Sequence, residues 1–474
     1  MKSYSSFAEI STDLKAGVLT CEQVVQHHLA NIREHQALNV FLEVFEEEAL
    51  ERADIVQHKI KAGTAGKLAG LVVGIKDVFA YQDHELTASS KILEGFQSQF
   101  SATVVERLLE EDAIIIGRQN CDEFAMGSSN EHSAYGCVTN GAGTNRVPGG
   151  SSGGSAVAVQ MDMCRVSIGS DTGGSVRQPA AFCGILGFKP TYSRISRYGL
   201  AAYASSFDTI GILSKCVEDT ALTLEVIAGA DEFDSTVSTN EVAPYSKSLE
   251  SKGQYKIAYL AETLEAKGLA PDVKTSFHQF LNTLSGDGHQ VEAVNFGLLD
   301  YLLPTYYILT TAEASSNLSR YDGVKFGYRA ENPGSLEDMY KLSRSEGFGK
   351  DVQRRIMLGT FVLSASYYDA FYTKAQRVRR LIKEETEKIL DSYDFIVLPT
   401  TPTTAFEIGA INDPIDMFLA DLYTVQANVS GIPAISIPVG VDQDELPIGM
   451  QIMSAHFSEE KLLAFSHRVL SNYN

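Results

Sequence analysis

The chain has 474 residues, of which 44% are hydrophobic and 21% are charged. This balance is typical of a packed globular protein and excludes a disordered chain, a fibrous repeat or a coiled coil. Its 60 acidic residues outnumber 39 basic ones, which gives a formal net charge of −21. Because proteins that grip nucleic acid usually carry a basic surface, we expect any nucleic acid involved here to be held by a partner.

Six cysteines are scattered along the chain without a C-x-x-C pair. This spacing fits neither a zinc site nor a disulfide scaffold, so we expect free, buried thiols in a reducing compartment and no bound metal. The N-terminal segment lacks the apolar run of a secretory signal, and no apolar run reaches the roughly 18 residues that span a bilayer. The sequence therefore predicts a cytoplasmic protein.

The first 62 residues are predicted to form a helical N-terminal segment. Thr20 and Gln23 make a capping-box pattern before apolar residues at helical spacing, and a second helix is predicted from Glu46 to about Ile60. Further along, short β-branched runs alternate with helical segments. The predicted strands are Val72–Lys76, Ala113–Gly117, Cys164–Gly169, Lys256–Leu260, Phe395–Pro399, Ala434–Pro438 and Pro447–Met453.

A long amphipathic helix is predicted near residues 366 to 392. Its apolar stripe consists of Phe371, Ala375, Val378, Ile382 and Ile389. The alternation of strands and helices favours an α/β fold. Because no internal repeat or long linker divides the chain, we predict one large α/β/α domain over residues 1–474. Its central sheet is predicted to be mixed, mainly parallel, and covered by helices on both faces.

Two Gly/Ser-rich stretches lie in the predicted catalytic core, residues 68–220. They are Gly149-Gly-Ser-Ser-Gly-Gly-Ser155 and Asp171-Thr-Gly-Gly-Ser175. Such stretches are usually linkers, but apolar segments at 156–168 and 180–188 surround these two. Glycine allows main-chain N–H groups to approach a ligand closely. A serine in such a loop can therefore be a nucleophile with its oxyanion hole alongside.

Three interpretations of these serines compete. Gly149-x-Ser151-x-Gly153 matches the nucleophile elbow of α/β-hydrolases, which must follow a strand, whereas residues 140–148 are turn-rich. A phosphate-binding loop needs Gly-Lys-Ser/Thr after its glycines, and no such sequence occurs. The third interpretation combines both loops with a lysine.

These two stretches, together with Gly74-Ile-Lys-Asp77, closely resemble the amidase signature family, and the chain is identified as a member of it. The resemblance implies the family's fold and a Ser-Ser-Lys triad, in which Lys76 is the base, Ser151 the bridging serine and Ser175 the acylated nucleophile. The intervals of 75 and 24 residues between them fit the family's usual spacing. The N–H groups of Thr172, Gly173, Gly174 and Ser175 are then expected to hold the oxyanion.

The chemistry of these residue types is consistent with that implication. A serine hydroxyl attacks efficiently only when a base takes its proton, and lysine is a base only when neutral, so its pKa must fall from about 10.4. Lys76 closes an apolar strand, where desolvation favours the neutral form. Considered singly, Lys76 could be a solvated charge, Ser151 a turn residue and Ser175 a helix N-cap. Asp171 and Arg177 are expected to brace the loop as a charge-assisted pair.

Further stretches are similar to the tRNA-dependent amidotransferase branch of this family. They include Asn120–Gly127, Glu313–Gly323, Arg354–Thr360 and Leu398–Thr404. This similarity implies that the chain releases ammonia from glutamine through a glutamyl-enzyme, for the conversion of Glu-tRNA(Gln) to Gln-tRNA(Gln). It also implies that this chain has no cofactor, that a partner B subunit binds ATP and Mg and holds most of the tRNA, and that a small C subunit completes a heterotrimer.

Glutamine carries an α-carboxylate and an α-ammonium group, and a pocket for it needs one charge of each sign. The resemblance implies that Arg355 binds the carboxylate and Asp421 the ammonium, with Ser128 and Tyr306 as further contacts. A solvent-facing helix charge is the alternative for Arg355. The segment 128–146 departs from the family pattern, so the resemblance does not specify which residues form the lip of the pocket. His132, within this segment, is expected to be a surface histidine.

Two other functions fit parts of this sequence. A stand-alone amidase acting on small aliphatic or aryl amides would keep the triad but would have an apolar acyl pocket and no partners. A non-catalytic scaffold protein is disfavoured, since it has no reason to retain Lys76, Ser151 and Ser175.

Overall fold

A single mixed sheet of eleven strands runs through the part of the computed structural model that is described, residues 2–143, 145–266, 268–411 and 413–473. The strand order is β1-β3-β2-β4-β6-β5-β10-β11-β9-β7-β8. The strands are β1 Phe41–Val44, β2 Val72–Lys76, β3 Ile114–Gln119, β4 Val166–Asp171, β5 Leu186–Lys189, β6 Thr209–Ser214, β7 Lys256–Leu260, β8 Gln290–Val294, β9 Phe395–Pro399, β10 Ala434–Val441 and β11 Pro447–Met453.

The direction of the strands corrects one part of the predicted fold. Among the described residues, β2 is parallel to β3 and β4, and β7 is parallel to β8 and β9. The other six neighbouring pairs are antiparallel. The α/β class and the mixed sheet are confirmed, but the predicted excess of parallel pairs is wrong. A short turn such as the one between β10 and β11 forces an antiparallel pair, whereas the apolar pattern of a buried strand is the same for both directions.

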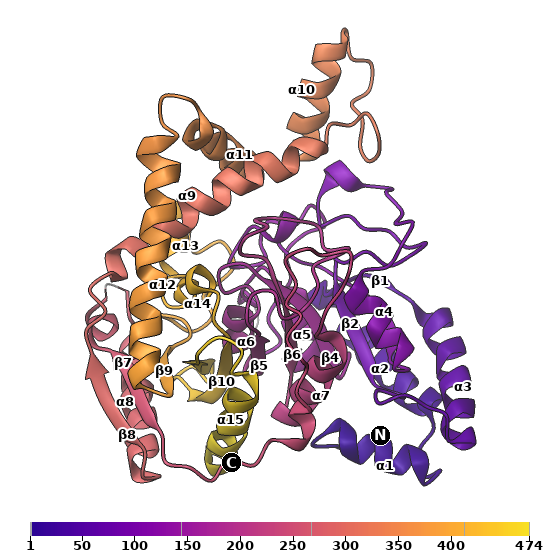
Figure 1. Cartoon of the computed structure of the whole chain (residues 1–474). Coiled ribbons are helices and arrows are strands. Elements are labelled where there is room, and N and C mark those ends of the chain that lie inside the picture. Colours follow the sequence, from indigo (N-terminus) through magenta and orange to yellow (C-terminus); the bar gives the residue numbers. More distant parts are fainter. Residues whose placement is uncertain (1, 144, 267, 412, 474) are drawn as a thin grey trace.

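Helices flank the sheet in two groups, as the predicted α/β/α architecture requires. Helices α4, α7 and α15 contact one another in a row, and α5 packs beside α6 (Figure 1). The helices are α1 Phe7–Lys15, α2 Cys21–Glu34, α3 Glu46–Ala62, α4 Thr103–Glu110, α5 Gly153–Gln160, α6 Arg177–Cys183, α7 Val217–Ile227, α8 Pro271–Gly286, α9 Leu299–Asn317, α10 Leu336–Gly347, α11 Lys350–Leu363, α12 Lys374–Ser392, α13 Pro414–Leu419, α14 Val425–Ser430 and α15 Glu459–Tyr473.

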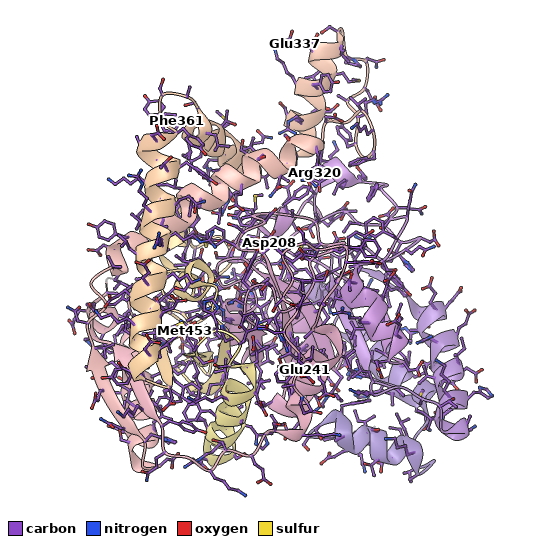
Figure 2. The ribbon with its side chains drawn as sticks, viewed as in Figure 1. Asp208, Glu241, Arg320, Glu337, Phe361 and Met453 are labelled. Atoms are coloured by element: carbon purple, nitrogen blue, oxygen red, sulfur yellow. The ribbon has the colours of Figure 1, made fainter. Side chains whose placement is uncertain are left out.

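Helices α9 to α12 rise above the end of the sheet. Helix α11 packs along α9, and α10 projects furthest from the core, opposite the end at which both chain termini lie (Figure 1). Glu337 sits near the outer end of α10 and Phe361 near the far end of α11, whereas Asp208 lies in the interior beneath them (Figure 2). Phe361 is 43% exposed and Asp208 only 3% exposed.

In the described part of the chain, no helix is both long enough and apolar enough to cross a membrane.

Most predicted elements form close to their expected positions. Thr20 and Gln23 make the reciprocal capping box at the start of α2, with N–H to side-chain distances of 2.9 and 3.2 Å. All seven predicted strands are present, although β3 and β4 begin at Ile114 and Val166, slightly later than expected. Strands β1, β5, β6 and β8 were not predicted; β1 and β5 are only four residues long, and β8 is a half-exposed edge strand.

The predicted helix at 366–392 begins differently from expectation. A π-helical turn, Asp369–Thr373, precedes α12. Ala375, Ile382 and Ile389 are buried as predicted, but Phe371 is 36% exposed, so the apolar stripe leaves the core in this first turn.

All six cysteines are free, as expected, and Cys137 and Cys216 are half-buried rather than buried.

Candidate active site

The parallel pairing of β2 with β4 determines where the site forms. Lys76 is the last residue of β2 and Asp171 the last of β4, so both lie at the same edge of the sheet. The chain leaves β4 directly into the second Gly/Ser loop, which ends at α6. The first Gly/Ser loop ends at α5, and α5 packs on β2 and β4. Both loops and the lysine therefore converge at one edge.

Lys76 is fully buried among serine hydroxyls. Its Nζ donates to Ser151 Oγ at 2.7 Å and to Ser152 Oγ and Ser170 Oγ at 3.0 Å each. Burial lowers the pKa of Lys76 to about 8, although several nearby acidic groups act in the opposite direction. The alternative of a solvated lysine is therefore wrong. Ser152 and Ser170 were not predicted as site residues. Ser152 follows the predicted Ser151 in the Gly/Ser run, and Ser170 precedes Asp171 at the end of β4.

The two Gly/Ser loops are joined directly, because the Ser152 N–H donates to the Ser175 carbonyl oxygen at 3.1 Å. Ser151 has no exposed surface, whereas Ser175 is 8% exposed. Val176, not Ser175, is the N-cap residue of α6, so the capping alternative for Ser175 is wrong. Among the described residues, no hydrogen bond links the Ser151 and Ser175 hydroxyls. The structure thus brings Lys76 and Ser151 together and places Ser175, which keeps a little exposed surface, on the adjoining loop.

A loop rather than a strand precedes Ser151, which removes the nucleophile-elbow interpretation. Glycine is required at position 150, because a Cβ there would lie 2.0 Å from Asp122 Oδ2. The Gly150 N–H donates to Gln178 Oε1 at 2.8 Å, and Asp122 accepts from the Asn130 N–H at 2.9 Å. The first loop is therefore held against the core by buried polar side chains.

Asp171 and Arg177 brace the second loop, as predicted. Both are fully buried, and Arg177 Nε and Nη2 donate to the two Asp171 carboxylate oxygens at 3.0 Å each. Burial alone would raise the pKa of Asp171, but the Arg177 guanidinium outweighs it and holds that pKa well below its usual range. Arg177 Nη1 also donates to the Thr424 carbonyl oxygen at 2.9 Å, which ties the loop to α14.

The same carboxylate changes the set of expected oxyanion donors. The Gly174 N–H donates to Asp171 Oδ1 at 2.8 Å, so this group is occupied within the protein. Within the described chain, no protein group accepts from the N–H of Gly173 or Ser175. Thr172 uses its hydroxyl to donate to Asp208 Oδ1 at 2.8 Å. The Thr172 N–H likewise has no acceptor among the described residues, so the main-chain donors left for an incoming oxygen are those of Thr172, Gly173 and Ser175.

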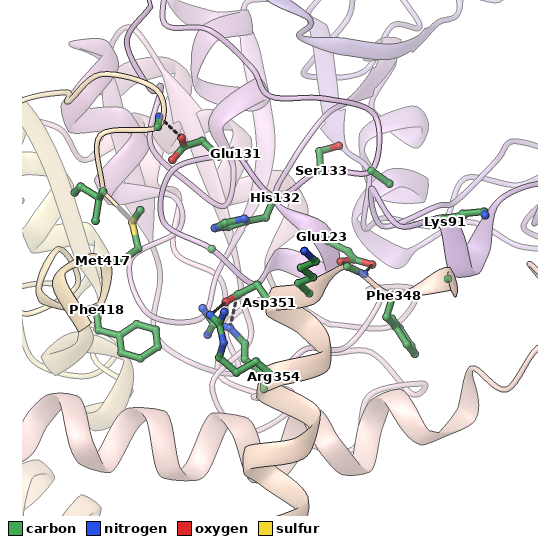
Figure 3. A pocket seen from close by; sticks show the side chains of 18 of the residues that line it. Lys91, Glu123, Glu131, His132, Ser133, Phe348, Asp351, Arg354, Met417 and Phe418 are labelled. Atoms are coloured by element: carbon green, nitrogen blue, oxygen red, sulfur yellow. Dashed lines mark hydrogen bonds and ion pairs between the residues drawn. The ribbon is translucent and has the colours of Figure 1, made fainter. Parts of the chain in front are cut away.

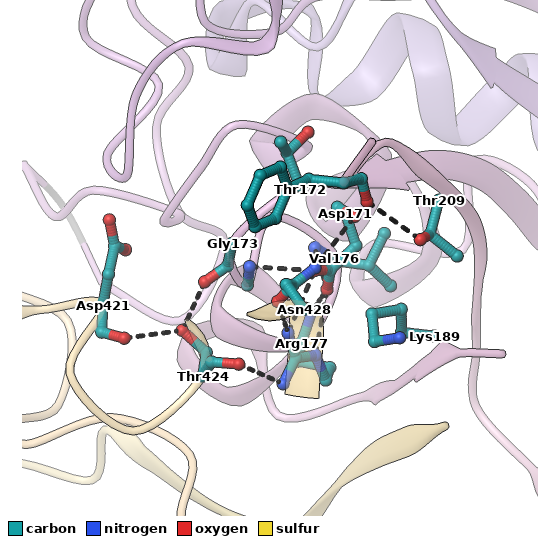
Figure 4. Close-up of polar contacts among 12 residues, drawn as sticks. Asp171, Thr172, Gly173, Val176, Arg177, Lys189, Thr209, Asp421, Thr424 and Asn428 are labelled. Carbon is teal, nitrogen blue, oxygen red and sulfur yellow. Dashed lines mark hydrogen bonds and ion pairs between the residues drawn. The ribbon is translucent and has the colours of Figure 1, made fainter. Parts of the chain in front are cut away.

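Asp421, in the turn between α13 and α14, lies in a polar cluster with Ser128. Asp421 Oδ1 accepts from Ser128 Oγ at 2.8 Å, and Oδ2 accepts from the Tyr307 hydroxyl at 2.6 Å. Burial raises the pKa of Asp421 to about 6 despite these hydrogen bonds. Figure 4 shows Thr424 between Asp421 and Gly173; its hydroxyl is 2.6 Å from the Gly173 oxygen and 3.1 Å from the Asp421 carbonyl oxygen. Asp421 is thus coupled to the second Gly/Ser loop.

Tyr306 and Tyr307 are neighbours on α9 and have different contacts. Tyr306 lies against the second loop, because a Cβ on Gly173 would be 2.4 Å from its hydroxyl oxygen. Tyr307, which was not predicted, binds Asp421 directly. Only its position next to Tyr306 hinted at a role in the sequence.

Arg355, on α11, is 7% exposed. Its Nε donates to Asp351 Oδ2 at 2.8 Å and its Nη1 to the Tyr203 hydroxyl at 3.1 Å. The guanidinium lies 5.6 Å from the ring centre of Tyr307. The alternative of a solvent-facing helix charge is therefore wrong for Arg355. It fits the neighbouring Arg354, whose side chain is 56% exposed.

A cavity of about 650 Å³ is lined in part by Arg355, Asp351 and Phe418. Of the predicted site residues, Arg355 is the one found in its described lining; Lys76, Ser151, Ser175 and Asp421 lie outside it. Figure 3 shows Met417 and Phe418 on one side, Glu123 and Phe348 on the other, and His132 above. His132 is exposed at the lip, as expected, and its main-chain N–H donates to Asp122. Residue 144, in the divergent segment 128–146, lies outside the described residues.

Comparison with known proteins places this geometry in a family. Residues 23–463 match the family model described as Amidase. The chain is 49% identical over 467 residues to the glutamyl-tRNA(Gln) amidotransferase A subunit of Chlorobium phaeobacteroides, covering 98% of each chain. It is 44% identical over 471 residues to that of Acinetobacter baumannii, covering 98% of this chain and 96% of that one.

Solved structures with the same fold include an amidotransferase subunit and a peptide amidase. The crystal structure of the glutamyl-tRNA(Gln) amidotransferase A subunit from Thermotoga maritima aligns with a TM-score of 0.76 at 38% identity, covering 94% of this chain and 93% of that chain. The peptide amidase of Stenotrophomonas maltophilia aligns with a TM-score of 0.83 at 27% identity, covering 98% and 96%.

Proposed function

The chain belongs to the amidase family, and we propose that it hydrolyses the side-chain amide of glutamine as the A subunit of a glutamyl-tRNA(Gln) amidotransferase. The observation that carries this proposal is the presence of Arg355 and Asp421, two buried and oppositely charged groups, beside a serine–lysine site. A zwitterionic substrate needs such a pair, whereas a neutral amide does not.

The first half of the reaction acylates Ser175. Neutral Lys76 accepts the proton of Ser151, which accepts the proton of Ser175 as the Ser175 oxygen attacks the amide carbon. The free N–H groups of the second loop, those of Thr172, Gly173 and Ser175, are the donors for the negative oxygen of the tetrahedral intermediate. When the C–N bond breaks, the proton returns through Ser151 to the nitrogen, and ammonia leaves.

The second half releases glutamate. Water attacks the glutamyl ester on Ser175, and the same relay takes its proton and returns one to the Ser175 oxygen. The sum is glutamine plus water giving glutamate plus ammonia. Arg355 and Asp421 hold the α-carboxylate and α-ammonium throughout, so the side-chain amide is presented to Ser175 in a fixed orientation.

The relatives named above are parts of a larger enzyme, and the partners follow from that role. In the proposed assembly, the B subunit uses ATP with Mg and the released ammonia to convert Glu-tRNA(Gln) to Gln-tRNA(Gln), and the C subunit joins the two. The formal charge of −21 fits an arrangement in which the B subunit holds most of the tRNA. Because charged tRNA is the shared substrate, the assembly is expected in the cytoplasm.

A stand-alone amidase is the competing function, since an amidase at 27% identity has the same fold. The deciding experiment measures ammonia release from glutamine and from a neutral aliphatic amide, with the chain alone and copurified with its partners. The proposal expects glutamine to be the better substrate and the partners to increase the rate. Preference for the neutral amide, independent of partners, would favour the competing function.

A further inference from the structure

Glu123 is a buried carboxylate that the mechanism above does not use. It lies in the turn after β3, is 3% exposed and lines the same cavity as Arg355. Burial raises its pKa to about 7. An idle carboxylate in such a place is costly, so its contacts are informative.

Those contacts lead to the start of α11. Glu123 Oε2 and Oε1 accept from the Gly349 N–H at 2.9 and 3.1 Å, across 226 residues of sequence. The Ser90 hydroxyl donates to Glu123 as well as to the Gly347 carbonyl oxygen. Gly349 is the N-cap residue of α11 and has no side chain to cap that helix, so Glu123 supplies acceptor oxygens at the start of the helix.

The segment Gly347-Phe348-Gly349 fits this contact closely. A Cβ on Gly349 would lie 2.4 Å from Glu123 Oε2, and one on Gly347 would lie 2.6 Å from Ile92 Cδ1. The Phe348 ring packs 5.7 Å from that of Phe124. Figure 3 shows Glu123 facing the chain where it enters α11. Two glycines thus allow the linker between α10 and α11 to lie directly on the core.

Arg355 lies on α11, the helix that begins at this attachment. Asp351, in the first turn of α11, accepts from Arg355 Nε at 2.8 Å and thereby orients the guanidinium. Burial opposes ionisation of Asp351, but Arg355 outweighs it and lowers the Asp351 pKa. A shift at Gly349 therefore moves both members of the pair that faces the cavity.

We propose that Glu123 is a positioning residue that anchors the start of α11 to the core and so sets the place of the Arg355 guanidinium, which would bind the α-carboxylate of the substrate. This inference rests on the proposed glutamine substrate, because Arg355 acts on the α-carboxylate. The consequence is selective: loss of the anchor weakens binding of a carboxylate-bearing substrate and leaves the serine–lysine chemistry intact.

The test measures KM and kcat for glutamine, and kcat/KM for a neutral aliphatic amide, in the copurified complex. Glu123→Ala should raise KM for glutamine about three- to tenfold, the range of one hydrogen bond, with kcat within about twofold of wild type. The neutral amide should be turned over as before. Glu123→Gln keeps an acceptor for the Gly349 N–H and should restore KM to near the wild-type value.

Gly349→Ala provides an independent variant. Its φ of −67° suits any residue, so alanine acts only through the contact with Glu123. It should also raise KM for glutamine, and the double variant with Glu123→Ala should be no worse than Glu123→Ala alone, because the clash is gone. Glu337→Gln is the matched control, because Glu337 is an exposed carboxylate on α10.

Unchanged KM for glutamine in Glu123→Ala, equal losses on both amides, failure of Glu123→Gln to recover, or additive losses in the double variant would each overturn the inference. A wild-type complex that does not hydrolyse glutamine would instead contradict the proposed function.

Discussion

Lys76 Nζ lies 2.7 Å from Ser151 Oγ, and neither residue has any surface exposed to solvent. This burial has two effects that support each other. Desolvation lowers the pKa of Lys76 and makes a neutral amine available near neutral pH. The same exclusion of water keeps the serine hydroxyl directed at the amine rather than at solvent.

The rate should follow the ionisation of Lys76. Because only the neutral amine accepts a proton, kcat/KM should rise with pH through an apparent pKa of about 8. Lys76→Ala should be inactive, and Lys76→Arg should not restore activity, since a guanidinium stays charged. A pH–rate profile of the copurified complex checks this; an inflection near 10.5, the ordinary lysine value, would contradict the assignment.

Ser175 should carry the covalent intermediate. Ser175→Ala is expected to abolish ammonia release and to remove any glutamyl adduct seen by mass spectrometry of quenched wild-type enzyme. His132→Ala should keep most of the activity, because no histidine takes part in the relay. An adduct mapped to Ser151 or Ser152 would show that the nucleophile is misassigned.

Arg355 and Asp421 should determine specificity. Replacing either with alanine leaves one charge of the zwitterion unpaired, at a cost of about 1.5–3 kcal/mol, or roughly ten- to a hundredfold in kcat/KM for glutamine. A neutral aliphatic amide should lose far less. Arg354→Ala, an exposed neighbour, is the control for Arg355. Equal losses on both substrates would assign these two residues to folding instead.

Glutamine binding should weaken in mild acid. Only the ionised Asp421 carboxylate attracts the α-ammonium group, and its pKa is about 6, so protonation as the pH falls through 6 removes the attraction. KM for glutamine is expected to rise below that pH, whereas KM for a neutral amide is not. Parallel acid dependence of both KM values would mean that another group is titrating.

The buried Asp171–Arg177 pair should be important for stability. Arg177→Met leaves Asp171 charged and unpaired in a fully buried site and should lower the free energy of unfolding by about 3–5 kcal/mol. Arg380→Met, which breaks an exposed pair with Glu384, should lower the free energy of unfolding far less, because solvent screens that pair. Urea denaturation compares the two; similar small losses would show that the buried pair is replaceable.

Local pattern and motif made much of this protein predictable from its sequence. The capping box at Thr20 depends on residues three apart, and the strand Val72–Lys76 on a short apolar run, so neighbours in the chain are sufficient to specify them. The family resemblance likewise rests on contiguous residues around Lys76, Ser151 and Ser175. These features need no knowledge of the rest of the fold.

The tertiary structure decided what depends on distant residues. Tyr307 and Ser128 meet Asp421 across 114 and 293 residues, and the direction of each buried strand follows from the connections rather than from its composition. The Gly174 N–H, predicted as an oxyanion donor, instead donates to the Asp171 carboxylate. Contacts of this kind form only when packing brings separate elements together, because an apolar or polar pattern specifies which face of an element is buried but not which side chain it will meet.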